Sequence, residues 1–466
     1  MPSRRSFLAT ASLVLAGCTT GPATTSTGTD GEPSTRPATT PPGSRTTDDR
    51  GSGTDDGETT DRDDRTPPSG DAVAWTLDVG APVATTPVLD PDADVLYAAA
   101  GSFERGERPR DASDDQAARD VVAASTDDGA EPWRYAATAD VVDLMPAAGG
   151  AYAAVGWPTW PEGTDFRVEK LSGGERAWRS AGDRKELSLV GTTAEGGVLA
   201  GTHDDGLNVG GETLFAHDAD GRERWSVESG DAFGGAVVDG RAYLSFADRL
   251  TRCVDVASGE TVWEAPGGIL AGYDDPRVYG DAIYVEDDVG DGPTHVVAHD
   301  ATDGSERWRY TATPEDSTFV PVDAVEANGL VHVAEFGGFH VALDAATGTE
   351  RWRGALGSDV ADGPVIVDDL VVYAGEGGGL VAFDAATGER QWRTRLDARA
   401  TRVVAHAGGL TANLRDDRGA TLVRYGLDGT RTWTFEHAAD VTQFVAGDDG
   451  RAYLGTDDGY LVALAT

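Results

Sequence analysis

Only a few side chains in this 466-residue sequence have the types and spacing that a reaction or a metal ion requires. Three carboxylates alternate in Asp90-Pro-Asp92-Ala-Asp94, as at the start of a calcium-binding loop, because a hard cation binds several oxygen ligands. An EF-hand would then need a glutamate at the position of Gly101. The segment therefore predicts a surface turn.

A metal site built from imidazoles is a second candidate. His295 and His299 are four residues apart, which on a strand places both side chains on one face, where they could hold a metal ion. However, His299 and His217 stand where related segments of the chain have Leu343 and Phe383. We therefore predict that these histidines fill strand positions and bind no metal.

The candidate nucleophiles are equally sparse. Cys253 is one of only two cysteines and occupies a position where related segments have valine or alanine, which predicts a small buried side chain. No serine lies in a Gly-x-Ser-x-Gly turn. No catalytic, cofactor-binding or metal-binding residue is predicted.

Two tryptophans form the best candidate for a contact site. Trp157 and Trp160 lie in Gly156-Trp-Pro-Thr-Trp-Pro-Glu162, outside the pattern that the other tryptophans follow. Aromatic side chains flanked by proline are rigid anchors for a protein or a sugar, because little conformational entropy is lost on binding. The alternative is local packing over an irregular part of the fold.

The candidate residues described above lie in a chain that is built from sequence repeats. Tryptophan recurs after a glycine turn, and two clear copies are Val341-Ala-Leu-Asp-Ala-Ala-Thr-Gly-Thr-Glu-Arg-Trp352 and Val381-Ala-Phe-Asp-Ala-Ala-Thr-Gly-Glu-Arg-Gln-Trp392. A period of about 40 to 45 residues with several short strands in each unit is typical of a β-propeller. The tryptophans predicted to pack between blades are Trp75, Trp133, Trp178, Trp225, Trp263, Trp308, Trp352, Trp392 and Trp433.

Within 71–466, the sequence pattern of each repeat unit predicts a blade of four strands. Short runs of Val, Leu, Tyr and Phe bounded by Asp-Gly, Asp-Asp and Gly-Gly are typical of hairpins. Asp384 and Thr387 can cap the turn before the last strand, and Gly388 can supply the positive φ that the turn requires.

The ends of the array predict a closed ring. The final strand, Tyr460 to Ala465, has no tryptophan strand after it, whereas Ala74 to Val79 has the tryptophan-strand pattern with no repeat before it. We expect the N-terminal strand to complete the last blade, which removes exposed sheet edges. The sequence predicts an all-β propeller and leaves eight and nine blades open.

The charge of the chain is strongly negative. Asp and Glu number 80 against 38 Lys and Arg, for a formal charge of −42. Hydrated carboxylates suit concentrated salt, which screens their repulsion, so the composition indicates a halophile, and we expect a haloarchaeon. Nucleic acid is not an expected partner, because phosphate binding requires clustered Lys and Arg.

The N-terminus predicts export and anchoring. Arg4 and Arg5 precede a short apolar run and read as a twin-arginine signal, and Leu15-Ala16-Gly17-Cys18 resembles a lipobox whose cysteine receives lipid. We therefore predict a signal peptide at 1–18 and a disordered Thr/Ser/Pro/Asp-rich stalk at 19–70. The propeller, 71–466, would lie outside the cytoplasm, attached to the outer face of the cell membrane.

The Ala-Leu-Asp-Ala-x-Thr-Gly-x-x-x-Trp unit resembles the repeat of the pyrroloquinoline quinone (PQQ) propeller family over nearly all of 71–466. That resemblance implies one of two classes. One comprises calcium-dependent quinoprotein dehydrogenases, and the other comprises non-enzymatic propellers that include BamB-like exported lipoproteins.

The residues favour the second class. The dehydrogenases commonly hold the quinone against a disulfide between adjacent cysteines, and this chain has no adjacent cysteines. Its asparagines, Asn208, Asn328 and Asn413, lie in no recognisable calcium-ligand pattern. We expect no PQQ and no enzymatic activity, but a scaffold or ligand-binding module with an extracytoplasmic protein partner. A quinoprotein dehydrogenase and a solute- or sugar-binding propeller are the alternatives.

Overall fold

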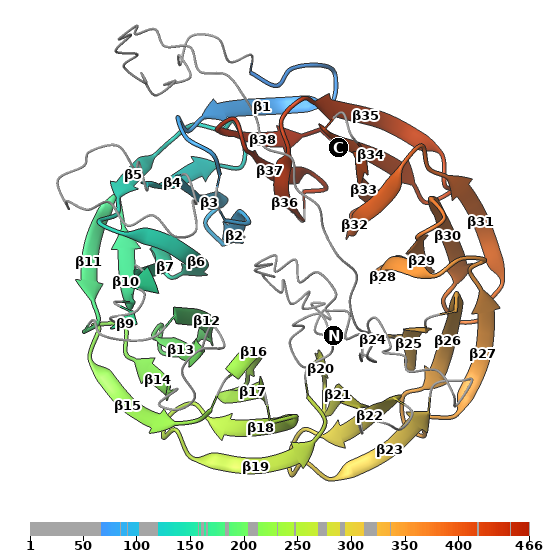
Figure 1. Ribbon diagram of the computed structural model, residues 1–466, viewed down its shortest axis with the longest axis horizontal. Helices are drawn as coiled ribbons and strands as arrows, with labels where there is room; N and C mark the ends of the chain where they lie inside the picture. The colour runs from blue at the N-terminus through green and yellow to red at the C-terminus, as the bar shows by residue number, and fades with distance from the viewer. Residues whose placement is uncertain are drawn as a thin grey trace, which may run out of the picture. The chain divides into compact units, whose positions relative to one another are not determined.

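The computed structural model describes most of the chain from residue 67 onward. The described ranges are 67–83, 85–90, 92–101, 120–156, 158–159, 163–164, 166–181, 186–203, 213–230, 232–246, 248–268, 277–288, 294–311, 324–335, 337–416, 419–447 and 449–465. Within them the protein is all β, and nine four-stranded sheets form the blades of a ring (Figure 1). The predicted β-propeller is confirmed, and the count that the sequence left open is nine.

The blades are numbered here in chain order, each from its inner to its outer strand. Blades 1 to 3 are β2 (Val88–Asp90), β3 (Val95–Ala100), β4 (Asp120–Ser125), β5 (Trp133–Ala136); β6 (Asp140–Ala147), β7 (Gly150–Gly156), β10 (Arg167–Ser172), β11 (Glu175–Arg179); and β12 (Glu186–Thr192), β13 (Val198–His203), β14 (Thr213–His217), β15 (Glu223–Glu228). Blades 4 to 6 are β16 (Ala232–Val238), β17 (Arg241–Phe246), β18 (Leu250–Asp255), β19 (Thr261–Pro266); β20 (Arg277–Tyr279), β21 (Ala282–Asp288), β22 (Thr294–Asp300), β23 (Glu306–Thr311); and β24 (Ala324–Ala327), β25 (Leu330–Glu335), β26 (Phe339–Asp344), β27 (Glu350–Ala355). Blades 7 to 9 are β28 (Val360–Val367), β29 (Leu370–Gly375), β30 (Gly379–Asp384), β31 (Arg390–Arg395); β32 (Arg399–His406), β33 (Gly409–Asp416), β34 (Gly419–Gly426), β35 (Arg431–His437); and β36 (Val441–Ala446), β37 (Ala452–Thr456), β38 (Tyr460–Leu464), β1 (Val73–Asp78). A separate hairpin joins β8 (Pro158–Thr159) to β9 (Gly163–Thr164).

The ring closes through its two ends, as the sequence predicts. β1 pairs antiparallel with β38, placing Trp75 opposite Ala463 and Asp78 opposite Tyr460. The amide of Ala465 also donates to the carbonyl of Ala72 at 2.7 Å. Blade 9 therefore contains the first and the last described strands, which lie side by side in Figure 1.

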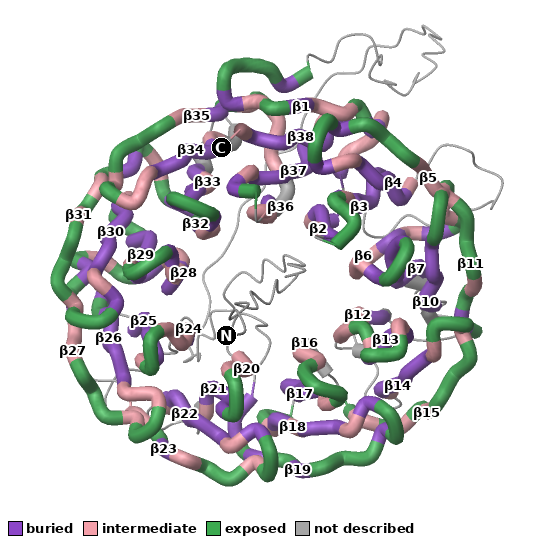
Figure 2. Tube along the Cα trace, turned by 180° about the vertical axis from the view of Figure 1, so that it is seen from behind, coloured by how far each residue is buried: buried purple, intermediate pink, exposed green. Residues whose placement is uncertain are grey.

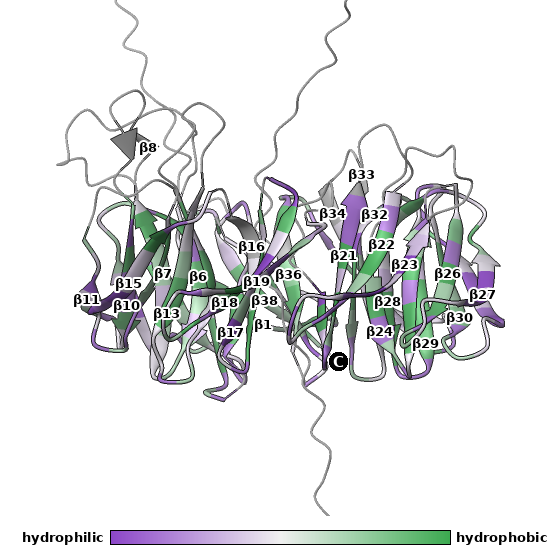
Figure 3. Cartoon of the chain, turned by 90° about the horizontal axis from the view of Figure 1, so that it is seen from below, coloured by the Kyte–Doolittle hydropathy of each residue, from purple (hydrophilic) through white to green (hydrophobic). Residues whose placement is uncertain are grey.

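The hydrophobic core lies between the blades. Nine clusters of buried side chains occur among the described residues, and each is shared by two neighbouring blades. Third strands such as β30 are buried along most of their length, whereas outer strands such as β11 and β15 are mostly exposed (Figure 2). Seen edge-on, β11 and β27 carry mainly hydrophilic residues (Figure 3). Because no blade has a core of its own, each blade is stabilised by its neighbours.

The blade tryptophans connect consecutive blades on the outer side of this core. Seven of them donate a hydrogen bond from the indole nitrogen to a backbone carbonyl of the following blade, at 2.7 to 3.1 Å. The seven are Trp75, Trp178, Trp225, Trp263, Trp308, Trp392 and Trp433. A buried tryptophan contributes a large apolar contact and usually satisfies its N–H in this way.

In seven blades the glycine of the turn lies against the ring of the tryptophan of the blade before it. Asp384 accepts hydrogen bonds from the amide and the hydroxyl of Thr387, both at 2.8 Å, which closes the turn. Gly388 follows with a φ of 74°. A Cβ at Gly388 would lie 2.5 Å from the Trp352 ring, so both the φ and the contact require glycine.

On the inner side of the ring, two aspartates connect neighbouring blades. Asp143 on β6 accepts from the amide of Leu189 on β12 at 2.8 Å. Asp362 on β28 accepts in the same way from the amide of Val403 on β32, at 2.5 Å. Each carboxylate lies at a bulge in its own strand, which turns the side chain toward the next blade.

The interface between blades 6 and 7 departs from this pattern. His332 and His340 are both fully buried there, with His332 Nδ1 3.5 Å from His340 Nε2. The His340 ring lies 4.2 Å from the ring of Trp352, whose indole nitrogen has no hydrogen-bond partner among the described residues. Burial lowers the pKa of His332 to about 4 and lowers that of His340 well below its ordinary value. Both imidazoles are therefore neutral in the folded protein at pH 7.

The glycine contact predicts a large effect of a single methyl group. Gly388→Ala should lower the free energy of unfolding by about 2 to 4 kcal/mol, because a strained φ and a clash with Trp352 act together. Gly408→Ala is the matched control, since Gly408 has a φ of 75° and nothing within 4 Å of its Cβ position. The control should lose only about 1 kcal/mol. Urea unfolding of both variants at fixed KCl measures the difference; equal losses would contradict the packing role of the glycine.

The buried histidine pair predicts acid sensitivity of the blade 6 to blade 7 interface. A folded-state pKa below that of the unfolded chain means that the unfolded chain binds more protons, so stability falls as the pH decreases from about 6.5 to about 4. The loss should be on the order of 3 kcal/mol for His332 alone. His332→Val with His340→Leu restores the residues that blade 7 has at these positions, Val372 and Leu380. This variant should show a smaller loss over that range; an unchanged pH profile would refute the assignment.

Candidate functional site

Several predicted site residues lie outside the described part of the chain. These are the lipid-attachment residue Cys18, the export residues Arg4 and Arg5, and the proposed contact tryptophans Trp157 and Trp160. Their roles stay predictions. The described part of the chain contains no helix with the length and apolar character needed to cross a lipid bilayer.

The histidines whose spacing suggested a metal site lie within hydrogen-bonding distance of other protein atoms. His299 is buried, and its two ring nitrogens lie 3.1 Å from the Gly304 carbonyl and 2.9 Å from the Pro266 carbonyl. His295 Nδ1 lies 3.0 Å from the hydroxyl of Thr311. Among the described residues, no group of three or more His, Cys, Asp or Glu side chains is arranged to hold a metal ion.

Cys253 is buried on β18, and burial raises the pKa of its thiol. A thiol in this environment is a poor nucleophile, because the thiolate is the reactive form. The acidic segment near Asp90 forms a turn in which Asp90 Oδ1 accepts from the amides of Asp92 and Ala93, at 3.1 and 3.2 Å.

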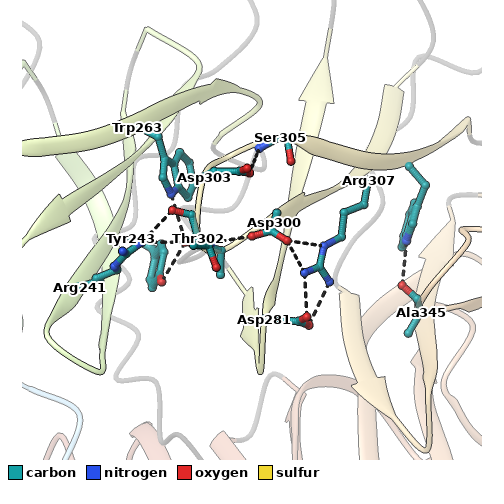
Figure 4. A network of polar contacts seen from close by, with 12 residues as sticks. Arg241, Tyr243, Trp263, Asp281, Asp300, Thr302, Asp303, Ser305, Arg307 and Ala345 are labelled. Carbon is teal, nitrogen blue, oxygen red and sulfur yellow. Dashed lines mark hydrogen bonds and ion pairs between the residues drawn. The ribbon is translucent and has the colours of Figure 1, made fainter.

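Aspartates of the glycine turns are held within the fold. In blade 5, Asp300 accepts from the amide of Thr302 at 2.8 Å and from Arg307 Nη2 at 2.6 Å (Figure 4). The hydrogen bond from Arg307 is the main reason why the pKa of Asp300 lies below its ordinary value. Arg307 also contacts Asp281 at 2.9 Å.

The same region joins blades 4 and 5 (Figure 4). Trp263 and Tyr243 both donate to the carbonyl of Ala301, at 3.1 and 3.3 Å, and Arg241 donates to the carbonyl of Thr302 at 2.9 Å. The polar groups of this turn therefore hold the neighbouring blade in place.

A second polar arrangement recurs on the outer surface, which we call the arginine bridge. In three blades the sequence Glu-x-Trp-Arg places an arginine directly after the blade tryptophan. The side chain of this arginine forms ion pairs with that glutamate and with a second acid on an adjoining part of the same blade. The three sets are Arg134 with Glu131 and Asp120, Arg309 with Glu306 and Asp287, and Arg353 with Glu350 and Glu335.

The bridge in blade 6 has the most deeply buried acid. The side chain of Glu335 is 1% exposed and accepts from Arg353 Nη1 at 2.7 Å and from the Tyr310 hydroxyl at 2.9 Å. Arg353 Nη2 also donates to Tyr310 at 2.7 Å. Exposed ion pairs contribute about 0 to 1 kcal/mol, but a buried carboxylate without its partner is strongly destabilising. The bridge therefore stabilises the contact between blades 5 and 6.

Blade 2 has a related cluster around another buried acid. Glu169, which is fully buried, accepts from Arg167 at 3.0 Å, Arg176 at 3.2 Å and the hydroxyl of Tyr135 at 2.8 Å. These ionic clusters were not predicted from the sequence. The spacing Glu-x-Trp-Arg was the available signal, although the second acid of each bridge comes from another part of the blade.

The repeated residues of the unit make their contacts within the ring. The turn aspartates, turn glycines and tryptophans contact the same or the neighbouring blade, so the repeat itself builds a ring. What remains for a ligand is the set of surfaces that vary from blade to blade, which are the loops and the outer strands.

Comparisons with solved structures agree with this architecture. The crystal structure of BamB from Moraxella catarrhalis superposes with a TM-score of 0.51 at 17% identity, covering 70% of this chain and 96% of that one. The C-terminal WD40 domain of Sif2 superposes with a TM-score of 0.53 at 8% identity, covering 84% of this chain and 99% of that one. At these identities the likeness shows the fold alone.

One curated relative is similar in sequence. The serine/threonine-protein kinase AfsK of Streptomyces griseus is 36% identical over 179 residues, which are 35% of this chain and 20% of the kinase. The chain thus spans about a fifth of the length of that relative.

A family model described as outer membrane protein assembly factor BamB matches residues 164–318 and 292–418. The matched segments together cover more than half of the chain. This nine-bladed propeller therefore belongs to the family of the outer membrane protein assembly factor BamB.

Proposed function

We propose that this protein is a non-enzymatic module that binds a protein partner outside the cytoplasm. The observation that supports this most is the role of the repeated residues. Asp384 closes its own turn, Gly388 packs under Trp352 of the preceding blade, and Trp392 donates to the Leu427 carbonyl of the following blade. A ring held in this way is a rigid support, and rigid surfaces bind partners with little loss of conformational entropy.

The family supports the same proposal. The matching model is described as an outer membrane protein assembly factor, and a role in assembly would depend on contacts with other proteins. The kinase activity in the name of the Streptomyces relative has no support here, because the match covers only 20% of that protein.

The N-terminus supports a location at the membrane surface. In this proposal Arg4 and Arg5 direct export, Cys18 carries the lipid, and the polar segment 19–70 separates the propeller from the membrane. The partner is then a protein at the outer face of the cell membrane. Trp157 and Trp160 are the residues that we assign first to the contact.

Partner capture tests the proposed function directly. The lipoprotein, extracted from its membranes in molar KCl, should retain a stoichiometric protein identifiable by mass spectrometry. Trp157→Ala with Trp160→Ala should remove that protein while leaving cooperative unfolding intact. Val262→Ala with Phe339→Ala is the control, because these are exposed apolar residues elsewhere on the ring. A bound quinone or sugar in place of a protein would instead support a dehydrogenase or a sugar-binding propeller.

Membrane anchoring is tested separately. Cys18→Ser should move the protein from the membrane fraction to the medium, since no lipid can then be attached. Arg4→Lys with Arg5→Lys should leave precursor inside the cell. Immunoblots of fractionated cells give both results, and membrane association of the serine variant at the wild-type level would exclude the anchor.

A further inference from the structure

The arginine bridge is broken in blade 7. There the sequence is Arg390-Gln391-Trp392-Arg393, so an arginine stands where blades 5 and 6 have Glu306 and Glu350. The acid at the end of the second strand is also missing, because Gly375 ends β29 where Glu335 ends β25. Arg393 has therefore lost both carboxylates that hold its equivalent, Arg353.

Blade 7 instead presents three arginines close together on its outer strand, which we call the arginine stripe. Arg390, Arg393 and Arg395 are all exposed, and none has an ion pair among the described residues. Two acids that flank this part of the blade have other partners, since Glu376 pairs with Arg399 at 2.8 Å and Asp397 with Arg431 at 3.5 Å. These three cations lie in a chain whose formal charge is −42.

The repeat geometry places the three side chains together. The bulge of β31 pairs Phe383 with Arg390, as the bulge of β27 pairs Leu343 with Glu350. In blade 6 the side chain at that position reaches the arginine three residues later at 3.0 Å. Arg390 and Arg393 occupy the same two positions on β31, so their like charges repel each other when the side chains approach, and an anion between them would remove that repulsion.

The spacing of the stripe matches an extended peptide. Arg393 and Arg395 are alternate residues of a strand, so their side chains leave the same face about 6.6 to 6.8 Å apart. Carboxylates at alternate positions of a bound strand have the same spacing. β31 is also the outermost strand of its sheet, with β30 as its only strand neighbour in the described structure, so its outer backbone edge can pair with such a peptide.

We infer that the arginine stripe on β31 binds an extended acidic segment of the protein partner, with Asp or Glu at alternate positions. This inference rests on the proposed function and names the chemistry of the partner. A short peptide fits better than a long polyanion, because a long polyanion would extend over other parts of a chain with a formal charge of −42 and be repelled there.

Peptide binding tests the inference. The probe is a fluorescent peptide in which glutamate and threonine alternate, measured by anisotropy at the lowest KCl concentration at which circular dichroism shows the native fold. Arg390→Gln, Arg393→Gln and Arg395→Gln together should weaken binding about tenfold or more, since charge-assisted contacts are lost. The control replaces Arg179, Arg222 and Arg224, which are exposed on or beside other outer strands, by glutamine and should bind like wild type.

A second peptide tests the strand geometry. It has the same length, composition and charge, but all its glutamates precede all its threonines, so the carboxylates do not alternate. This block peptide should bind several-fold more weakly than the alternating one. Equal binding of the two peptides, equal affinity of the stripe variant and the wild type, or a preference for a carboxylated polysaccharide over the alternating peptide would each overturn the inference.

Partner capture separates this inference from the proposed function. If the wild-type protein retains a partner and the stripe variant retains it equally, the stripe is not the binding surface, while the proposed function stands. If the wild-type protein captures no partner, the proposed function fails, whatever the peptide does. Loss of the partner in the stripe variant, with the control variant unaffected, supports both.

Discussion

The contact between the indole of one blade and the glycine turn of the next is the constraint on which the ring depends. At Trp352 and Gly388 the contact leaves no room for a methyl group, and at Trp392 the indole also donates to the following blade. Because every hydrophobic cluster of the described residues lies between two blades, each blade needs its neighbours for stability. Closure by β1 and β38 gives the last blade the same support as the others.

Some residues of the repeat unit make the ring rigid, and other residues vary from blade to blade. The turn aspartates and glycines repeat and make contacts within the ring, whereas the residues around each tryptophan differ between outer strands. In blade 6 they form an internal ion-pair set around Glu335, and in blade 7 they leave Arg393 without one among the described residues. The same backbone position can thus stabilise the fold or remain open to a ligand. In the proposed function, this division lets one repeat provide both a rigid support and a specific surface.

Much of the fold could be predicted because its determinants are close in sequence. Asp384, Thr387 and Gly388 lie within five residues, and the spare tryptophan strand at the N-terminus indicated how the ring closes. The ionic sets could not be predicted as easily, since Glu335 reaches Arg353 only through strand register. The histidine pair likewise meets across the hairpin of β25 and β26. The number of blades could not be predicted from the sequence, because the repeat pattern is degraded in blades 2 and 3.

The central claim is that the N-terminal strand closes the ring. Hydrogen exchange of this strand tests the claim most directly. The amides of β1 (Val73–Asp78) and β38 (Tyr460–Leu464) would be followed by mass spectrometry in concentrated KCl. A sealed ring predicts that the paired amides of β1 are protected as strongly as those of the outer strands of other blades, because opening them requires opening blade 9. Exchange of β1 at the rate of an unstructured chain, with β38 still protected, would contradict closure and with it the rigid support on which the proposed function rests.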